Sequence, residues 1–301
     1  TSVSRGLGDV YKRQVVESGE WEMSDGTRFS AGTTTTDKLT SAGFETITFD
    51  NSFNDTPSLL TQVQTYNGGD WVTTRTNRIT GQSFNVAMQE EEKLNSGGHA
   101  PETLGWFAID SGTANDGDTI LEGGITGNSF NHVASAESFS ASFTDTPAFI
   151  AKLGSYRGAD PASLRTTEIS SDGFKAFVAE EQSFDGELIH ITESINFLAM
   201  DSSSGSLGGS EYTTATTSRL GEYGTISADH NWQTVSFNNS YTNPVVIVSD
   251  PSFNGGDPGN IRIRNVGTSS FDLKFQEPNY KDGSHTKEQA SYLVVESGEW
   301  E

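Results

Sequence analysis

Apolar and polar residues alternate with a period of two along much of this chain, and this pattern predicts half-buried β-strands. In one such segment Phe84, Val86 and Met88 share a face, and no segment carries a convincing apolar stripe at helical spacing. Turn-forming runs rich in Gly, Asn and Asp separate the segments. We therefore expect an all-β protein, with the first strands at 15–21, 45–50, 58–67, 71–80, 83–91 and 102–110.

One skeleton of residues occurs three times, so the fold must be considered as a repeat. It runs from a Pro through an aromatic residue, an Asp, an Arg, a Phe and a Glu to a His-x-x-Glu motif. The copies are Pro57, Tyr66, Asp70, Arg75, Phe84, Glu90, His99 and Glu102; Pro147, Tyr156, Asp160, Arg165, Phe174, Glu180, His190 and Glu193; and Pro244, Phe253, Asp257, Arg262, Phe271, Glu277, His285 and Glu288.

The period of about 93 residues is near the common size of a domain. We define unit 1 as residues 15–110, unit 2 as 111–201 and unit 3 as 202–296, and expect each to be a six-stranded antiparallel β-sandwich. The sequence of residues 15–22 returns at 294–301, so 297–301 is expected to start a fourth unit of a longer array. Residues 1–14 do not fit the pattern and read like a translated sequencing adapter, so we exclude them as an artefact.

Composition and charge limit the classes of function. The net charge of −23 argues against nucleic acid and against anionic membranes as partners. No apolar run approaches the roughly 20 residues that span a bilayer, so membrane insertion is not expected. The absence of cysteine excludes disulfides and thiolate chemistry. The abundance of Gly, Ser, Thr and Asn is typical of an acidic extracellular or cell-surface β-protein.

The repeated residues resemble the H-type lectin domain. Each unit has two aromatic residues four apart, followed by the Pro, an apolar strand, the Arg and a closing aromatic strand, and the resemblance covers essentially every unit. The aromatic pairs are Phe49 with Phe53, Phe139 with Phe143, and Phe237 with Tyr241, and the closing strands carry Trp106, Phe197 and Tyr292.

The resemblance implies carbohydrate binding without catalysis, with N-acetylgalactosamine as a possible ligand. It also implies trimeric assembly with sugar sites near the boundaries between domains, and it places Arg75, Arg165 and Arg262 at a sugar-contacting position. The aromatic-His pair that this family carries after its Gly-Phe turn is absent here, and residues 90–92, 180–182 and 277–279 replace it.

The repeated Arg has two interpretations. Its planar group of donors suits sugar hydroxyls or a carboxylate. Alternatively, each Arg forms a cross-strand salt bridge with the Glu of its own unit, Glu90, Glu180 or Glu277. Both interpretations require the Arg and Glu strands to be antiparallel neighbours with their side chains within reach.

The other repeated residues also have a structural and a binding interpretation. His99, His190 and His285 either orient the last strand through a local hydrogen bond or contact sugar. Tyr66, Tyr156 and the equivalent Phe253 are either packing residues or platforms for a sugar ring. Asp70, Asp160 and Asp257 lie in Gly-rich turns, where Asp is favoured for backbone bonding alone.

We expect neither a metal nor a cofactor nor catalysis. One His and scattered carboxylates per unit do not supply a zinc site without bridging units. Residues 115–118 suggest a calcium loop, but the other units lack it and the ligand spacing is not met. Adjacent acids such as Glu90 and Glu91 point to opposite faces of a strand, which does not suit glycoside hydrolysis.

Two functions remain. The chain is either a glycan-binding, adhesin-type array that gains avidity from repetition, or a structural spacer or assembly module of an extracellular stalk. We also expect the three units to pack as a pseudo-trimer within one chain, with Trp106, Phe197 and Tyr292 at its centre.

Overall fold

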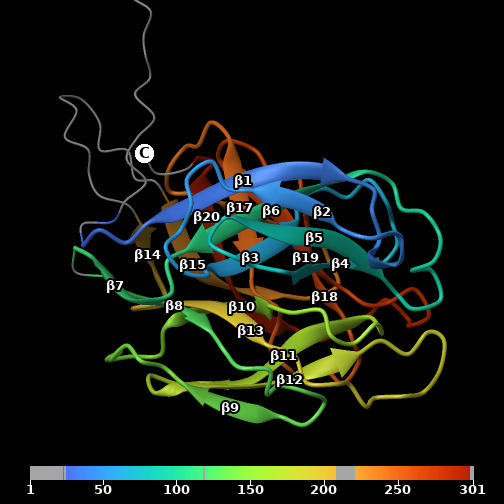
Figure 1. Ribbon diagram of the computed structural model, residues 1–301. Helices are drawn as coiled ribbons and strands as arrows, with labels where there is room; N and C mark the ends of the chain where they lie inside the picture. The colour runs from blue at the N-terminus through green and yellow to red at the C-terminus, as the bar shows by residue number, and fades with distance from the viewer. Residues whose placement is uncertain (1–22, 24, 118, 208–220, 299–301) are drawn as a thin grey trace, which may run out of the picture.

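The computed structural model describes residues 23, 25–117, 119–207 and 221–298, and within these the chain is all-β. The strands form six small antiparallel sheets, two for each unit (Figure 1). The predicted strand at 15–21, the adapter-like residues 1–14 and residues 299–301 lie outside the described part. None of the described helices is long and apolar enough to cross a membrane.

Unit 1 contains two three-stranded sheets, β1-β6-β3 and β2-β5-β4. Its elements are β1 (Phe29–Thr36), the short 3-10 helix η1 (Thr40–Ala42), β2 (Glu45–Thr48), β3 (Ser58–Val63), β4 (Val72–Asn77), β5 (Ser83–Glu90) and β6 (Glu102–Ile109). The five strands predicted after residue 40 are present, each ending one to four residues earlier than expected. The sequence pattern missed β1, because Ser, Gly and Thr dominate it and give no clear alternation.

Units 2 and 3 repeat this arrangement with one additional edge strand each, so they contain seven described strands rather than the expected six. Unit 2 has sheets β7-β8-β13-β10 and β9-β12-β11, and unit 3 has sheets β14-β15-β20-β17 and β16-β19-β18. The strands are β7 (Gly112–Asp116), β8 (Thr119–Ile125), β9 (Ser135–Ser138), β10 (Ala148–Leu153), β11 (Ala162–Ile169), β12 (Gly173–Glu180), β13 (Ile195–Met200), β14 (Ser204–Leu207), β15 (Gly221–Ala228), β16 (Gln233–Ser236), β17 (Pro244–Val248), β18 (Asn260–Arg264), β19 (Ser270–Gln276) and β20 (Glu288–Glu296).

The strand after each Pro is buried on both faces. In β10, Phe149 and Ala151 belong to the core of unit 2, whereas Ala148 and Ile150 belong to an apolar cluster that contains residues of all three units. In β17, Val246 and Val248 face the core of unit 3, and the alternate residues join the same shared cluster. Burial on both faces explains why these strands read as nearly continuous apolar runs.

Of the three expected aromatic residues of the closing strands, Trp106 belongs to the shared cluster, whereas Phe197 and Tyr292 do not. Trp106 packs against Phe49 and Phe84 of its own unit. Phe197 likewise lies in the core of unit 2, and Tyr292 packs on that of unit 3. The prediction that these three aromatics form the centre is therefore wrong for Phe197 and Tyr292. The residues on the opposite face of the closing strands, namely Phe107, Ile109, Leu198, Met200, Leu293 and Val295, join the shared cluster instead.

Contacts between units form a closed ring. Hydrogen bonds join unit 1 to unit 2 (Ser58 Oγ to Phe197 O, 2.8 Å), unit 2 to unit 3 (Phe149 N to Ser291 Oγ, 3.1 Å) and unit 3 to unit 1 (Asn260 Nδ2 to Val72 O, 2.8 Å). In Figure 1, unit 1 in blue to teal occupies the upper part and unit 2 in green to yellow the lower part.

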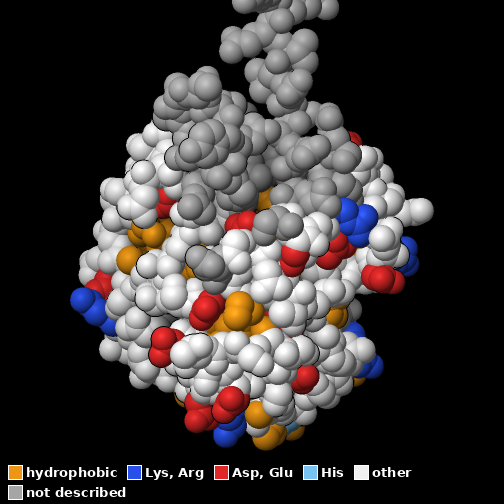
Figure 2. Space-filling view, turned by 90° about the vertical axis from the view of Figure 1, so that its left-hand side faces the viewer, with side chains coloured by type: hydrophobic (Ala, Val, Ile, Leu, Met, Phe, Trp, Pro, Cys, Tyr) orange, Lys and Arg blue, Asp and Glu red, His pale blue; other side chains and the backbone are white. Residues whose placement is uncertain are grey.

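Residues far apart in the sequence complete one sheet edge. Gly298, two residues after β20, pairs antiparallel with Ala31 of β1. Two backbone hydrogen bonds of 2.8 Å join them. The face in Figure 2 shows scattered acidic side chains with fewer basic ones, as expected from the net charge.

Candidate functional site

Within each unit, the last Glu of the skeleton binds the loop that carries the repeated aromatic residue. Glu102, at the start of β6, accepts hydrogen bonds from Asn67 N and Gly68 N, both at 2.9 Å, and from the Thr65 hydroxyl. Burial alone would raise the pKa of Glu102, but the hydrogen bonds from His99 and the loop lower this pKa to about 2. Glu193 and Glu288 bind the equivalent loops in units 2 and 3.

Each His bridges the two repeated glutamates of its unit. His99 Nδ1 contacts Glu90 Oε1, and its Nε2 lies 3.3 Å from Glu102 Oε1. Burial alone would lower the pKa of His99, but the hydrogen bonds to Glu102 and Glu90 raise it to about 9. At neutral pH His99 is therefore an imidazolium that donates to two carboxylates. The same bridges join His190 to Glu180 and Glu193, and His285 to Glu277 and Glu288.

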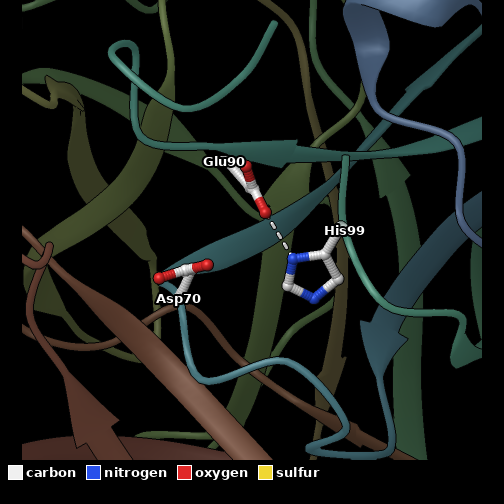
Figure 3. Close-up of side chains that lie close together, drawn as sticks. All are labelled: Asp70, Glu90 and His99. Atoms are coloured by element: carbon white, nitrogen blue, oxygen red, sulfur yellow. Dashed lines mark hydrogen bonds and ion pairs between the residues drawn. The ribbon is translucent and has the colours of Figure 1, made fainter. Parts of the chain in front are cut away.

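Figure 3 shows the one cluster among the described residues with the spacing of a metal site. One ligand atom each from Asp70, Glu90 and His99 lies within 4.8 Å of the others. The same side chains make hydrogen bonds within the protein: His99 Nδ1 contacts Glu90 Oε1, and Asp70 Oδ1 accepts from Asn279 Nδ2 at 2.6 Å. The cluster is thus explained by hydrogen bonding, and we derive no metal chemistry from it.

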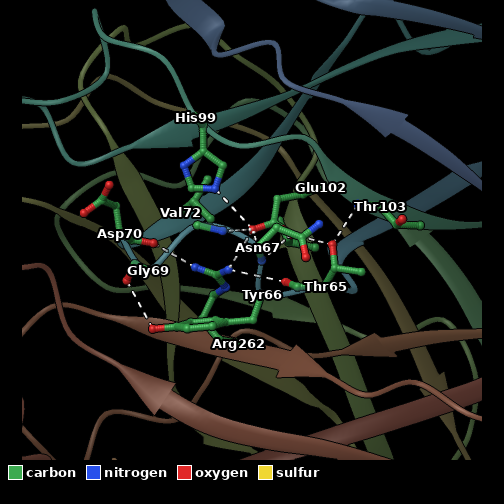
Figure 4. A network of polar contacts seen from close by, with 12 residues as sticks. Thr65, Tyr66, Asn67, Gly69, Asp70, Val72, His99, Glu102, Thr103 and Arg262 are labelled. Carbon is green, nitrogen blue, oxygen red and sulfur yellow. Dashed lines mark hydrogen bonds and ion pairs between the residues drawn. The ribbon is translucent and has the colours of Figure 1, made fainter.

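The guanidinium that completes each site comes from a different unit. Arg75 of unit 1 donates to Glu193 of unit 2 at 2.7 Å, and Arg165 of unit 2 donates to Glu288 of unit 3 at 2.6 Å. Arg262 of unit 3 lies 3.5 Å from Glu102 of unit 1 (Figure 4). All three Arg side chains and all three of these Glu side chains are fully buried.

Backbone carbonyls of the aromatic loop accept hydrogen bonds from further guanidinium nitrogens. Arg262 Nη1 donates to Asp70 O at 2.8 Å and Nη2 to Thr65 O at 3.4 Å. Arg165 makes three such bonds, to the carbonyls of Ser252, Gly255 and Asp257. Burial lowers the pKa of Arg262 to about 10, and Glu102 opposes this shift, so the guanidinium remains charged at neutral pH.

The repeated aromatic ring faces the incoming Arg. The guanidinium carbon of Arg262 lies 4.8 Å from the centre of the Tyr66 ring, and the corresponding distances are 5.0 Å for Arg75 and Tyr156 and 5.1 Å for Arg165 and Phe253. These are cation–π distances. Each Arg thus packs on the repeated ring, which favours the packing interpretation of these aromatic residues.

The predicted salt bridges of Arg75, Arg165 and Arg262 with Glu90, Glu180 and Glu277 of their own units are wrong. The strands are antiparallel neighbours as expected, but Arg75 lies opposite Ala87, and Glu90 is three residues from Ala87. An odd separation places Glu90 on the other face of the strand. Gln89 lies on the face of Arg75 and accepts from its Nη1 at 2.8 Å. In units 2 and 3 the Glu is likewise three residues from the residue opposite the Arg, so it also lies on the other face.

The Asp residues of the turns have three different environments. The Asp70 carboxylate accepts from Asn279 Nδ2 at 2.6 Å, and Asp257 forms an ion pair of 2.7 Å with Lys281. Asp160 is exposed. Only the backbone carbonyls of Asp70 and Asp257 enter the Arg sites, so a turn role accounts for the position.

The structure thus brings the repeated Arg, Glu, His and aromatic residues together, but in a buried junction. Every one of these Arg, Glu and His side chains is less than 9% exposed, which favours their structural interpretation, although Arg165, Glu180 and Phe253 border a pocket of about 220 Å³. Sequence reasoning missed Thr65, Ser155 and Ser252, whose hydroxyls bind the buried Glu. The sequence contained a signal for these three residues, because a Thr or Ser directly precedes the repeated aromatic residue in every unit.

A pair of adjacent glycines tests how tightly the junction is packed. A Cβ at Gly68 would lie 2.5 Å from the His99 ring, whereas one at Gly69 would have no neighbour within 4 Å. We expect Gly68→Ala to lower the free energy of unfolding by about 1–3 kcal/mol, since overpacking displaces a buried ring. Gly69→Ala should change it by less than about 0.5 kcal/mol. Equal effects of the two substitutions in urea titrations would contradict this packing.

Comparison with known proteins adds one relative. The chain is 31% identical over 192 residues to halomucin of Haloquadratum walsbyi, a match that covers 63% of this chain and 2% of halomucin. The chain therefore spans a small fraction of that much longer protein. No protein-family model and no solved structure matches the chain. The resemblance to H-type lectins stays a prediction.

Proposed function

We propose that this chain is a non-catalytic assembly module of a large secreted or cell-surface protein, in which three repeats close into one compact body. The observation that carries the proposal is the placement of each repeated Arg, buried in a junction built by another unit. The resemblance of each unit to the H-type lectin sandwich supports it, because that family assembles in threes. The partial match to halomucin, of which the matched region is 2%, fits a module of a much longer protein.

Small-angle scattering tests this proposal on the whole chain. A compact body of 301 residues has a radius of gyration of about 19 Å. We expect a value near this, together with a single cooperative unfolding transition that all probes report alike. A radius of gyration well above it, or separate transitions for the units, would indicate independent beads and reject the closed module.

Glycan binding is a second candidate function, at a different place from the buried Arg residues. A groove of about 500 Å³ lies between units 3 and 1, and hydroxyl and amide side chains line much of it. A related groove of about 310 Å³ lies between units 2 and 3. Uncharged donors and acceptors beside apolar surface suit a sugar. The lining of the larger groove includes Thr33, Thr65, Thr103, Thr242, Asn243 and Asn265.

A glycan array with the full chain displayed multivalently tests this candidate. Saturable binding that is lost in the double variant Asn243→Ala and Asn265→Ala, but kept in the exposed control Thr46→Ala, would support a sugar site in the groove. A blank array at high valency would reject glycan binding and leave the assembly role.

A further inference from the structure

Three different polar side chains, one from each unit, meet in the buried interior between the units. Gln62 of β3, Lys152 of β10 and Asp250, two residues after β17, form this axial trio. Lys152 Nζ donates to Asp250 Oδ1 at 2.6 Å and to Gln62 Oε1 at 3.3 Å. The three residues are between 4% and 7% exposed. Lys152 follows Ala148 and Ile150 on the face of β10 that joins the shared apolar cluster.

Backbone groups satisfy the remaining polar atoms of the trio. Asp250 Oδ2 accepts from Leu164 N of unit 2 at 3.1 Å. Gln62 Nε2 donates to Ile261 O of unit 3 at 3.2 Å. Each member therefore contacts units other than its own, and the charge of Lys152 is balanced by a buried carboxylate.

The trio is not repeated, in contrast to the Arg junctions. Gln62 and Lys152 occupy equivalent positions, five residues after Pro57 and Pro147, and unit 3 has Ser249 at that position with Asp250 next to it. Three copies of unit 2 around one axis would bury three Lys side chains without a carboxylate. Three copies of unit 3 would bury three carboxylates without a cation. Uncompensated buried charge is strongly unfavourable, so such assemblies are disfavoured.

We propose that the axial trio selects which repeats associate. The Arg junctions are alike in all units and cannot distinguish one repeat from another, whereas the trio is satisfied only when one unit of each kind is present. It thereby directs three consecutive repeats to close with one another and excludes association among repeats of one kind. This inference rests on the closed ring of the proposed function.

Charge reversals in the full chain test the trio. We expect Lys152→Asp and Asp250→Lys each to lower Tm by about 10 °C, because each leaves like charges buried together. The double reversal should recover at least half of that loss. The control Lys38→Asp alters an ion pair of 3.2 Å whose side chains are 39% and 35% exposed, and it should shift Tm by no more than about 2 °C.

Partner selection is tested by refolding the two single variants together from urea. When the two chains exchange unit 3, one ring pairs the carboxylate introduced by Lys152→Asp with the ammonium introduced by Asp250→Lys. The other ring pairs the native Lys152 with the native Asp250. We therefore expect a 1:1 mixed dimer by light scattering and native mass spectrometry, with Tm above that of either variant alone.

Three outcomes would overturn the proposal. The first is single variants as stable as Lys38→Asp, and the second is a double variant as unstable as the singles. The third is recovery in the double variant without a mixed dimer, since the trio would then stabilise without selecting. Failure of the closed ring itself is recognised separately, by an extended wild-type particle in scattering.

Discussion

Replacing Arg165 by Met is expected to lower the free energy of unfolding by about 3–5 kcal/mol. The guanidinium donates to Glu288 at 2.6 Å and to the carbonyls of Ser252 and Asp257 at 2.8 and 2.9 Å. Methionine preserves much of the apolar length but leaves Glu288 as a buried carboxylate without its cation. Urea unfolding followed by circular dichroism measures the change.

Arg157→Met provides the matched control. Arg157 belongs to the aromatic loop of unit 2, but its guanidinium is exposed and donates to Thr192, at 3.3 Å to the carbonyl and 3.4 Å to the hydroxyl. Its backbone N–H, which binds Glu193, survives the substitution. We expect a loss below about 0.5 kcal/mol. Similar losses for Arg157→Met and Arg165→Met would show that the buried junction does not hold the units together.

Acid is expected to destabilise the chain mainly between pH 4.5 and pH 2. Glu102 and Glu193 have folded-state pKa values of about 2, below the ordinary value of 4.5. Because these folded pKa values are depressed, their contribution is fully present above pH 4.5 and is lost as the pH falls toward 2. Each contributes on the order of 3 kcal/mol. Burial raises the pKa of Glu181 and of Glu91, so protonation of these two groups adds stability as the pH falls toward 4.5, above the window in which Glu102 and Glu193 lose theirs.

The variants Glu102→Gln and Glu193→Gln isolate this effect. Their stability at neutral pH should be lower than that of the wild type, and their unfolding free energy should depend less steeply on pH between 4.5 and 2. On the alkaline side, the raised pKa of His99 gives a contribution that is complete below pH 6.5 and is lost as the pH rises to about 9. Parallel pH profiles of wild type and variants would show that these carboxylates do not hold depressed pKa values.

The repeats identified a recurring set of residues, but neither the Glu that pairs with each Arg nor the unit that supplies that Glu. A residue that recurs in every unit can contact its partner within the unit or in the next, and both arrangements have the same periodic sequence. The register of β4 with β5, which the sequence did not give, places Ala87 opposite Arg75 and excludes Glu90 as its partner. It could not identify Glu193, which is 118 positions away and comes close only when the ring closes.

The apolar pattern was similarly incomplete. The alternation in β6 correctly placed Leu104, Trp106 and Ala108 in one core. Phe107 and Ile109 lie on the other face of β6. A strand with apolar residues on both faces must pack against a neighbour on each face, so these two residues indicate a second packing surface. The lesson for a short repeat is that a continuous apolar run signals a second buried face. The axial trio gave no repeated signal, because its members differ between the units.

The pairing of Ala31 with Gly298 determines how the module responds to pulling. These two residues are joined by two backbone hydrogen bonds, and the segments run antiparallel, so the chain enters and leaves on the same side of the pair. Tension along the chain therefore peels the bonds apart one after the other instead of shearing them together. We expect this pair to open before the three cores bear load. We therefore expect the pair of Ala31 and Gly298 to be the first point that yields when the chain is pulled from both sides.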